Sequence, residues 1–194
     1  MHESESKAPI LYIFSGLPGS GKSTLSQLVA RQLKAVYLRI DTIEQGLREL
    51  CSLDVQGEGY RLAYRIALDN LRLGVSVVAD SCNPIQLTRR EWEQVARDAR
   101  AEYINIEIVC SDSNEHRLRA ESRVAGVSGL RLPTWSEIEN REYDVWTVER
   151  VIVDTAGRSE AECARDLFSK LTPLRAESII TADATRRHVD AADM

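Results

Sequence analysis

A glycine-rich stretch near the N-terminus has the residue types and the spacing of a phosphate-binding loop. Residues 16–24 read GLPGSGKST and match the pattern GxxxxGK[ST] in full. The glycines let backbone N–H groups curl around phosphate oxygens, and the positive end of the following helix points at them. Lys22 can reach the β- and γ-phosphates of a nucleotide, and the Ser23 hydroxyl can ligate Mg²⁺. The predicted nucleotide-binding residues are Gly16, Pro18, Gly19, Ser20, Gly21, Lys22, Ser23 and Thr24.

Another glycine-rich motif fits this stretch less well. A dinucleotide-binding GxGxxG motif that began at Gly19 would need its third glycine at position 24, where the chain has Thr24. A chance glycine-rich turn would not also lie between a predicted strand and a predicted helix. The phosphate-binding interpretation is therefore favoured.

Two aspartates follow predicted strands directly. Asp41 comes after a strand predicted over 36–40, and Asp80 comes after one predicted over 75–79. Because the carboxyl ends of parallel strands meet at one edge of a sheet, both should lie beside the glycine-rich loop. We predict that Asp41 orients or deprotonates a phosphate acceptor, and that Asp80 holds Mg²⁺ or water. The alternative for each is a helix N-cap, and the division of roles between them stays open.

An arginine-rich stretch, HRLRAESR over residues 116–123, places Arg119 and Arg123 one helical turn apart. A segment with two glycines follows. The arginine-rich stretch and this segment together predict a mobile lid over about 115–132. Arginines there would stabilise charge on a transferring phosphoryl group, with Lys22 and Asp41 as the other catalytic residues, and closure would exclude water. The alternative is a solvated helix face that pairs with neighbouring glutamates. His116 is expected at the surface.

Short β-branched runs alternate with longer amphipathic runs, which predicts an α/β domain with a parallel sheet over residues 9–172. Predicted strands cover 10–14, 36–40, 75–79, 103–109 and 151–153. Capping boxes are predicted at Thr88, Thr134 and Ser159, and the last helix should end near Leu171. Segments 1–8 and 173–194 are predicted to be flexible. Three aromatic residues either fold the segment after the lid onto the body or line an acceptor site: Trp135, Tyr143 and Trp146.

Composition sets limits on the function. The 194 residues carry a formal net charge of −5, which does not favour non-specific binding to nucleic acid or membranes. No segment approaches the roughly 20 apolar residues of a membrane span. The N-terminus lacks the apolar stretch of a signal peptide, and the four cysteines form no CxxC pair. We therefore expect a cytoplasmic protein that does not bind membranes.

Together the motifs GLPGSGKST, Asp41, VVADSCNP over 77–84 and the arginine-rich helix resemble the small P-loop kinases. That group includes gluconate kinases, chloramphenicol phosphotransferases, zeta-toxin-like kinases, polynucleotide 5′-kinases and the AAA_33-type bacterial kinases. The resemblance covers about residues 9–172. It implies a P-loop NTPase fold with strand order 2-3-1-4-5 and a helical lid. It also implies ATP and Mg²⁺ as cofactors, Asp41 as the acceptor-activating residue, and Arg119 and Arg123 as lid arginines.

The resemblance leaves the acceptor open. Polynucleotide kinases carry an arginine one turn after the catalytic aspartate, whereas this chain has Glu44 there and its next arginine is Arg48. A small-molecule hydroxyl is therefore the favoured acceptor. A nucleic-acid end or a nucleotide is the second hypothesis, which a basic groove near Arg48, Arg61 and Arg65 would favour. The third is an NTP-binding switch or ATPase that acts through a partner. The sequence leaves the oligomeric state open.

Overall fold

The computed structural model describes the backbone of residues 8–190 and the side chains of residues 8–175. Residues 1–7 and 191–194, at the ends of the two segments predicted to be flexible, lie outside the described residues. The strands are β1 (Ile10–Ser15), β2 (Val36–Arg39), β3 (Val77–Asp80), β4 (Glu102–Val109) and β5 (Val151–Asp154). The helices are α1 (Lys22–Leu33), α2 (Ile40–Cys51), α3 (Glu58–Arg72), α4 (Gln86–Ala99), α5 (Ser113–Ser122), α6 (Trp135–Glu139) and α7 (Glu160–Asp190).

The five strands form one parallel sheet in the order β2-β3-β1-β4-β5, which confirms the order expected from the resemblance. The register aligns the carboxyl ends of three strands. Asp80 of β3 pairs with Phe14 of β1 on one side and with Arg39 of β2 on the other. Residues that follow these positions in the sequence are thereby brought to one edge of the sheet, where ligands bind in such folds.

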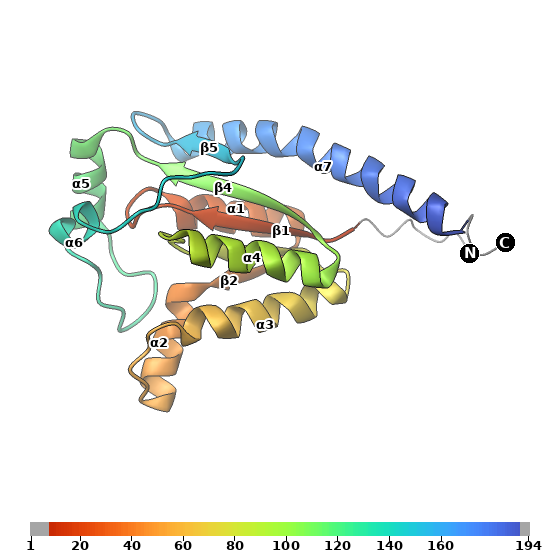
Figure 1. Cartoon of the computed structure of the whole chain (residues 1–194). Coiled ribbons are helices and arrows are strands. Elements are labelled where there is room, and N and C mark those ends of the chain that lie inside the picture. The colour runs from red at the N-terminus through yellow and green to blue at the C-terminus, as the bar shows by residue number, and fades with distance from the viewer. Residues whose placement is uncertain (1–7, 191–194) are drawn as a thin grey trace.

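Helices cover both faces of the sheet, and the side chains of β1 alternate between them (Figure 1). Tyr12 and Phe14 pack into a core cluster with α1 and α7. Leu11 and Ile13 pack into a second cluster with α3 and α4. This alternation follows from the two-residue period of a strand, and burial of both faces explains why β1 has no polar face. Helices α5 and α6 lie together beyond the carboxyl edge of the sheet (Figure 1).

Two helix boundaries differ from the sequence-based expectation. Thr88 lies inside α4, where its hydroxyl donates to the Ile85 carbonyl, so the predicted capping box there is wrong. The extended residue Ile85 precedes the first turn instead. The boxes at Thr134 and Ser159 are confirmed by reciprocal side-chain and backbone hydrogen bonds.

Helix α7 continues to Asp190 instead of ending near Leu171. Pro173 lacks an N–H donor and normally disfavours a helix interior. The residues that follow it include Leu174, Arg175 and Ala176, all good helix formers, and Leu174 packs against the core cluster of α1 and α7. Packing and propensity together outweigh the proline. No helix within residues 8–190 has the length and apolar character needed to span a membrane.

Candidate active site

The glycine-rich loop connects β1 to α1 and depends on glycine at its closest approaches. Gly16 has φ +142°, and a Cβ there would lie 2.3 Å from the carbonyl oxygen of Ile108. Gly19 has φ +91°, and a Cβ there would lie 3.1 Å from Cβ of Ala120 in α5. Side chains would therefore push the loop away from the sheet and from α5.

The first turn of α1 offers a cluster of backbone donors. Gly21 is the N-cap in a left-handed conformation with φ 92°, and no side chain caps the helix. Leu25 donates to the Gly21 carbonyl, but the N–H groups of Lys22, Ser23 and Thr24 have no backbone acceptor among the described residues. Unpaired N–H groups at the positive end of a helix form an anion-binding site. The local geometry thus supports the predicted phosphate-binding role.

Asp80 forms a buried ion pair with Lys22. Lys22 Nζ lies 2.9 Å from Asp80 Oδ1, and the exposed fractions of the two side chains are 11% and 0%. Tyr37 donates its hydroxyl to Asp80 Oδ2 at 2.5 Å. Burial alone would raise the pKa of Asp80, but the charge of Lys22 and hydrogen bonds from Tyr37, Lys22 and Ser23 lower it overall. Burial would likewise lower the pKa of Lys22, and Asp80 raises it.

Neither aspartate serves as a helix N-cap. Asp80 is the last residue of β3, and the N-cap of α2 is Arg39, so Asp41 is the second residue of that helix. The Asp41 side chain is 50% exposed, and Arg39 Nη2 donates to its Oδ2 at the long distance of 3.4 Å. Asp41 lines the same pocket as Lys22, and its charge helps to raise the pKa of that lysine. The carboxylate of Asp41 is thus free to contact a ligand.

The helix that was predicted to begin the lid packs on the glycine-rich loop. His116 is buried rather than at the surface, so that prediction is wrong. Its ring Nε2 lies 2.9 Å from the Pro18 carbonyl oxygen, and its ring meets Trp135 edge-on at 5.2 Å between centroids. An imidazole has both an apolar ring and polar nitrogens, so it can join the loop to α6. Sequence pattern did not reveal this, because α5 has almost no amphipathic character.

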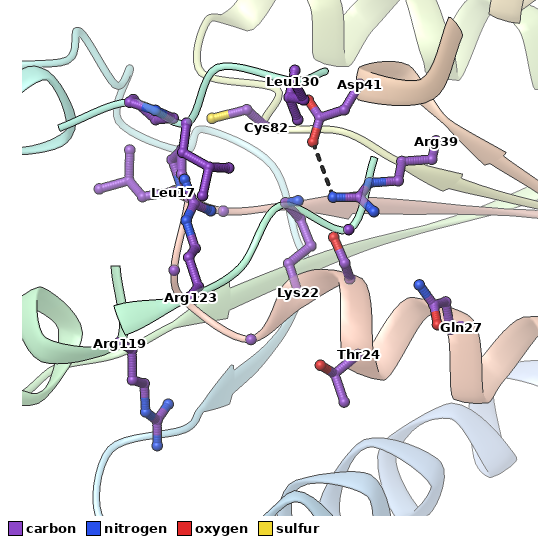
Figure 2. A pocket seen from close by; sticks show the side chains of 18 of the residues that line it. Leu17, Lys22, Thr24, Gln27, Arg39, Asp41, Cys82, Arg119, Arg123 and Leu130 are labelled. Carbon is purple, nitrogen blue, oxygen red and sulfur yellow. Dashed lines mark hydrogen bonds and ion pairs between the residues drawn. The ribbon is translucent and has the colours of Figure 1, made fainter. Parts of the chain in front are cut away.

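The two predicted lid arginines have different surroundings. Arg119 donates from Nη1 to Thr155 Oγ1 at 2.8 Å and from Nη2 to the Thr155 carbonyl at 3.0 Å, and it pairs with Glu115. It therefore joins α5 to the loop after β5 and points away from Lys22 (Figure 2). Arg123 follows α5 directly, and its Nε is buried without a hydrogen-bond partner among the described residues. Only Arg123 of the pair is oriented toward the Asp41 side of the site.

Lys22, Ser23, Asp41, Arg119 and Arg123 line one pocket of about 1220 Å³, whereas Asp80 and His116 are not among its lining residues. One end of the pocket is formed by Thr24, Thr155, Arg158 and Cys163, next to Arg119. The other end is formed by Arg39, Asp41, Cys82 and Arg141, together with residues 126–133 of the predicted lid. The glycine-rich loop and Lys22 lie between the two ends (Figure 2). The pocket is therefore long enough for a nucleotide at one end and a second ligand at the other.

Sequence reasoning missed several residues of the Asp41 end. Arg39 ends β2 and Tyr37 lies two residues earlier, so their proximity to Asp80 follows from strand pairing alone. Arg141 comes from a distant segment, and its Nη1 lies 3.9 Å from Cys82 Sγ. The available clue in the sequence was that Asp41 directly follows the strand predicted over 36–40, because this places the end of that strand at the predicted site.

Buried Glu107 of β4 anchors the segment that carries Arg141. It accepts hydrogen bonds from Tyr143 at 3.0 Å, Trp146 at 2.8 Å and Arg150 at 2.6 Å. The two aromatic residues therefore fold this segment onto the body, which decides the alternative left open by the sequence. Arg141, which precedes them, is held at the rim of the pocket.

The donor set near Lys22 fits Mg²⁺ bound together with a nucleotide. Ser23 and Asp80 supply one hydroxyl and one carboxylate next to each other. Magnesium typically takes one or two protein oxygens and completes its shell with phosphate oxygens and water. No group of three or more His, Cys, Asp or Glu side chains that could bind a metal by itself occurs in the part of the chain that is described.

Comparison with known proteins agrees with this geometry. The AAA_33 family model, described as an AAA domain, matches residues 11–128. Adenylyl-sulfate kinase from Shewanella halifaxensis is 26% identical over 96% of this chain and 92% of its own length. Two solved structures share the fold. APS kinase CysC from Mycobacterium tuberculosis has a TM-score of 0.62 at 22% identity, over 84% of this chain and 98% of its own. A gluconokinase from Sinorhizobium meliloti has a TM-score of 0.62 at 16% identity, over 88% and 96%. The chain belongs to the AAA_33 family and has the fold of the small P-loop kinases.

Proposed function

We propose that this AAA_33 family member is an ATP-dependent kinase that transfers the γ-phosphate to a hydroxyl group of a small molecule. The observation that carries the proposal is the position of Asp41. Its carboxylate is half-exposed, caps no helix and faces the same pocket as Lys22. A carboxylate beside a nucleotide phosphate site is the group that phosphoryl transfer to an alcohol requires.

In the proposed reaction, ATP lies along the glycine-rich loop with its phosphates on the N–H groups at the start of α1. Asp41 orients the acceptor hydroxyl and takes its proton as the new oxygen–phosphorus bond forms. The bond between Pγ and the β–γ bridging oxygen breaks, and ADP leaves. Lys22 and Arg123 neutralise charge on the transferring group, and Arg119 holds the loop after β5. Mg²⁺ near Ser23 and Asp80 would neutralise the β- and γ-phosphate oxygens.

The ion pair between Lys22 and Asp80 should rearrange when ATP and Mg²⁺ bind. The Lys22 ammonium is paired with Asp80 in this structure. Nucleotide phosphates offer that ammonium a competing negative charge, and Mg²⁺ offers one to the Asp80 carboxylate. Lys22 would then contact phosphate, and Asp80 would contact Mg²⁺. Each buried charge would thus keep a partner of opposite charge.

The similar proteins do not identify the acceptor of this chain. One relative is an adenylyl-sulfate kinase and another is a gluconokinase, so similar proteins act on different acceptors. A small molecule is favoured over a nucleic-acid end because Glu44 is paired with Arg48 at 3.1 Å instead of leaving a free cation there. Arg61 and Arg65 are exposed on α3 and do not line the pocket.

The test is ADP release with MgATP against a library of hydroxyl compounds, for wild type, Lys22→Ala and Asp41→Asn. We expect at least one acceptor to raise turnover above background. Lys22→Ala should abolish that gain, and Asp41→Asn should lower it by about 10²–10⁴-fold while binding of a non-hydrolysable ATP analogue stays near the wild-type level. Asp69→Asn, on the exposed side of α3, is the matched control and should not change turnover.

The kinase proposal would be contradicted if no acceptor raised the rate of ADP release and if Asp41→Asn left that rate unchanged. That result would favour an ATPase or switch that acts through a partner. Turnover of an oligonucleotide end above all small molecules would instead select the nucleic-acid alternative.

A further inference from the structure

We infer that the acceptor carries an oxyanion group, such as a phosphate, sulfate or carboxylate, which Arg39 and Arg141 bind beside Asp41. This inference rests on the proposed function, because it concerns the acceptor end of the same pocket. It arises from a cluster of three arginines, Arg39, Arg123 and Arg141, which surround Asp41 at that end.

Arg39 has more donors than partners. Its side chain is 16% exposed, so most of the side chain is out of water. Nη2 makes the long 3.4 Å contact to Asp41, and Nε is buried with no hydrogen-bond partner among the described residues. A buried N–H that lacks a partner costs free energy unless a ligand supplies an acceptor.

The other two arginines add uncompensated charge at the same place. Burial lowers the pKa of Arg123, Asp41 partly restores it, and the nearby charges of Arg39 and Arg141 lower it further. Arg123 is therefore close enough to Arg39 and to Arg141 for their charges to repel its own, and the carboxylate of Asp41 lies nearby. Arg123 Nε is buried without a partner in the described structure, as Arg39 Nε is.

Three other arginines of the pocket are paired with glutamates. Arg48 contacts Glu44 at 3.1 Å, and Arg131 contacts Glu137 at 2.8 Å. Arg119 pairs with Glu115. Arg158 pairs with Asp166, and Arg31 lines the pocket without an ion pair in the described structure. The cluster of three arginines around one carboxylate is thus at the Asp41 end, where the proposed acceptor would bind. Guanidinium groups recognise oxyanions through paired, charge-assisted hydrogen bonds.

The γ-phosphate of ATP does not account for the whole cluster. The glycine-rich loop and Lys22 already offer it donors, and Arg123 lies where it could contribute one more. Arg39 lies at the end of β2, and Arg141 contacts Cys82, which is beyond β3, so both are on the Asp41 side of Lys22. An acceptor whose hydroxyl meets Asp41 would bring a second part of its structure to these two arginines.

The predicted lid also passes over this cluster. A Cβ at Gly126 would lie 3.0 Å from Arg39 Nη1, so the lid backbone lies directly against the guanidinium. A segment in that position removes water from Arg39, which strengthens the attraction of its guanidinium for an anionic ligand. The acceptor end is therefore built for a charged ligand more than for a neutral alcohol.

The test uses inorganic sulfate and phosphate as probes on the full chain, with Mg²⁺ and a non-hydrolysable ATP analogue filling the nucleotide end. Calorimetry should show saturable anion binding to wild type. We expect Arg39→Gln and Arg141→Gln each to weaken it tenfold or more, because each removes charge-assisted hydrogen bonds. Arg61→Gln, an exposed arginine of α3 outside the pocket, should bind the anion like wild type. Arg141 is exposed, so Arg141→Gln remains informative if Arg39→Gln fails to fold.

Acetate as a third probe separates a carboxylate from a tetrahedral oxyanion, since the preferred group should bind most tightly. Anion binding that is not saturable, or that is equally strong in both variants, would overturn the inference. So would an acceptor library in which neutral alcohols are phosphorylated best and sulfate does not compete with them, although the kinase proposal would then stand. If no acceptor is phosphorylated but anion binding depends on Arg39 and Arg141, the kinase proposal fails and the oxyanion site is upheld.

Discussion

Lys22 of the glycine-rich loop and Asp80 at the end of β3 form a buried ion pair, with Nζ 2.9 Å from Oδ1. The pair joins residues that are 58 positions apart in the chain. It is possible because β3 lies next to β1 in the sheet, so the residue that ends β3 faces the loop that follows β1. The proposed metal-holding carboxylate and the proposed phosphate-binding lysine thereby hold each other in place before a nucleotide binds.

Removing the carboxylate should destabilise the nucleotide-free protein. In Asp80→Asn the buried Lys22 ammonium loses its compensating charge, and we expect a loss of about 3–5 kcal/mol in the free energy of unfolding by urea. The double variant Lys22→Met/Asp80→Asn should recover part of that loss, since no unpaired buried charge remains. Glu121→Gln, which breaks an exposed pair with Arg117, is the control and should have little effect. A single variant as stable as wild type would show that the pair contributes nothing.

The same pair predicts how stability depends on pH. The folded-state pKa of Asp80 lies below its usual 3.8, so its contribution is present above about pH 4 and is lost as pH falls through the lowered pKa. The difference in unfolding free energy between wild type and Asp80→Asn should therefore shrink as pH is lowered from 7 to 3. The raised pKa of Lys22 acts at the other end, where stability is present below pH 10.5 and is lost as pH rises through the raised pKa. A difference that stays constant at acidic pH would contradict this explanation.

Gly16 should tolerate a side chain much less than Gly157. Both have positive φ, at 142° and 65°, so both substitutions to alanine strain the backbone. A Cβ at Gly16 would also lie 2.3 Å from the Ile108 carbonyl oxygen, whereas nothing lies within 4 Å of one at Gly157. We expect Gly16→Ala to lower the melting temperature further than Gly157→Ala and to weaken binding of an ATP analogue at least tenfold. Equal effects would mean that the close approach to β4 is unimportant.

The two arginines of the lid region should affect different kinetic constants. Arg119 holds the loop after β5 through Thr155, so Arg119→Ala should raise the KM for ATP several-fold and change kcat less. Arg123 faces the Asp41 side of the pocket, so Arg123→Ala should mainly lower kcat. Arg117→Ala serves as the control, because Arg117 pairs with Glu121 on the exposed face of α5. The assignment is wrong if Arg119→Ala lowers kcat more than Arg123→Ala does.

The features that the sequence determined are those written in neighbouring residues. The predicted phosphate-binding loop is one such feature, because its glycines, Lys22 and Ser23 all lie within nine positions of the chain. The capping box at Thr134 is another, since the two residues that satisfy it are three positions apart. The alternation of strands and helices was also clear, because hydrophobic period and β-branched composition are local properties.

Contacts between distant parts of the chain were decided by the tertiary structure alone. The burial of His116 depends on contact with Pro18 and Trp135, which no helical period of α5 encodes. The arginine cluster brings together Arg39, Arg123 and Arg141 from three separate segments of the chain. The continuation of α7 past Pro173 depends in part on packing of Leu174 against the core. Contacts between residues far apart in the chain arise only when the sheet forms. The sequence therefore predicted the glycine-rich loop and Asp41, and the tertiary structure decided which arginines lie near Asp41.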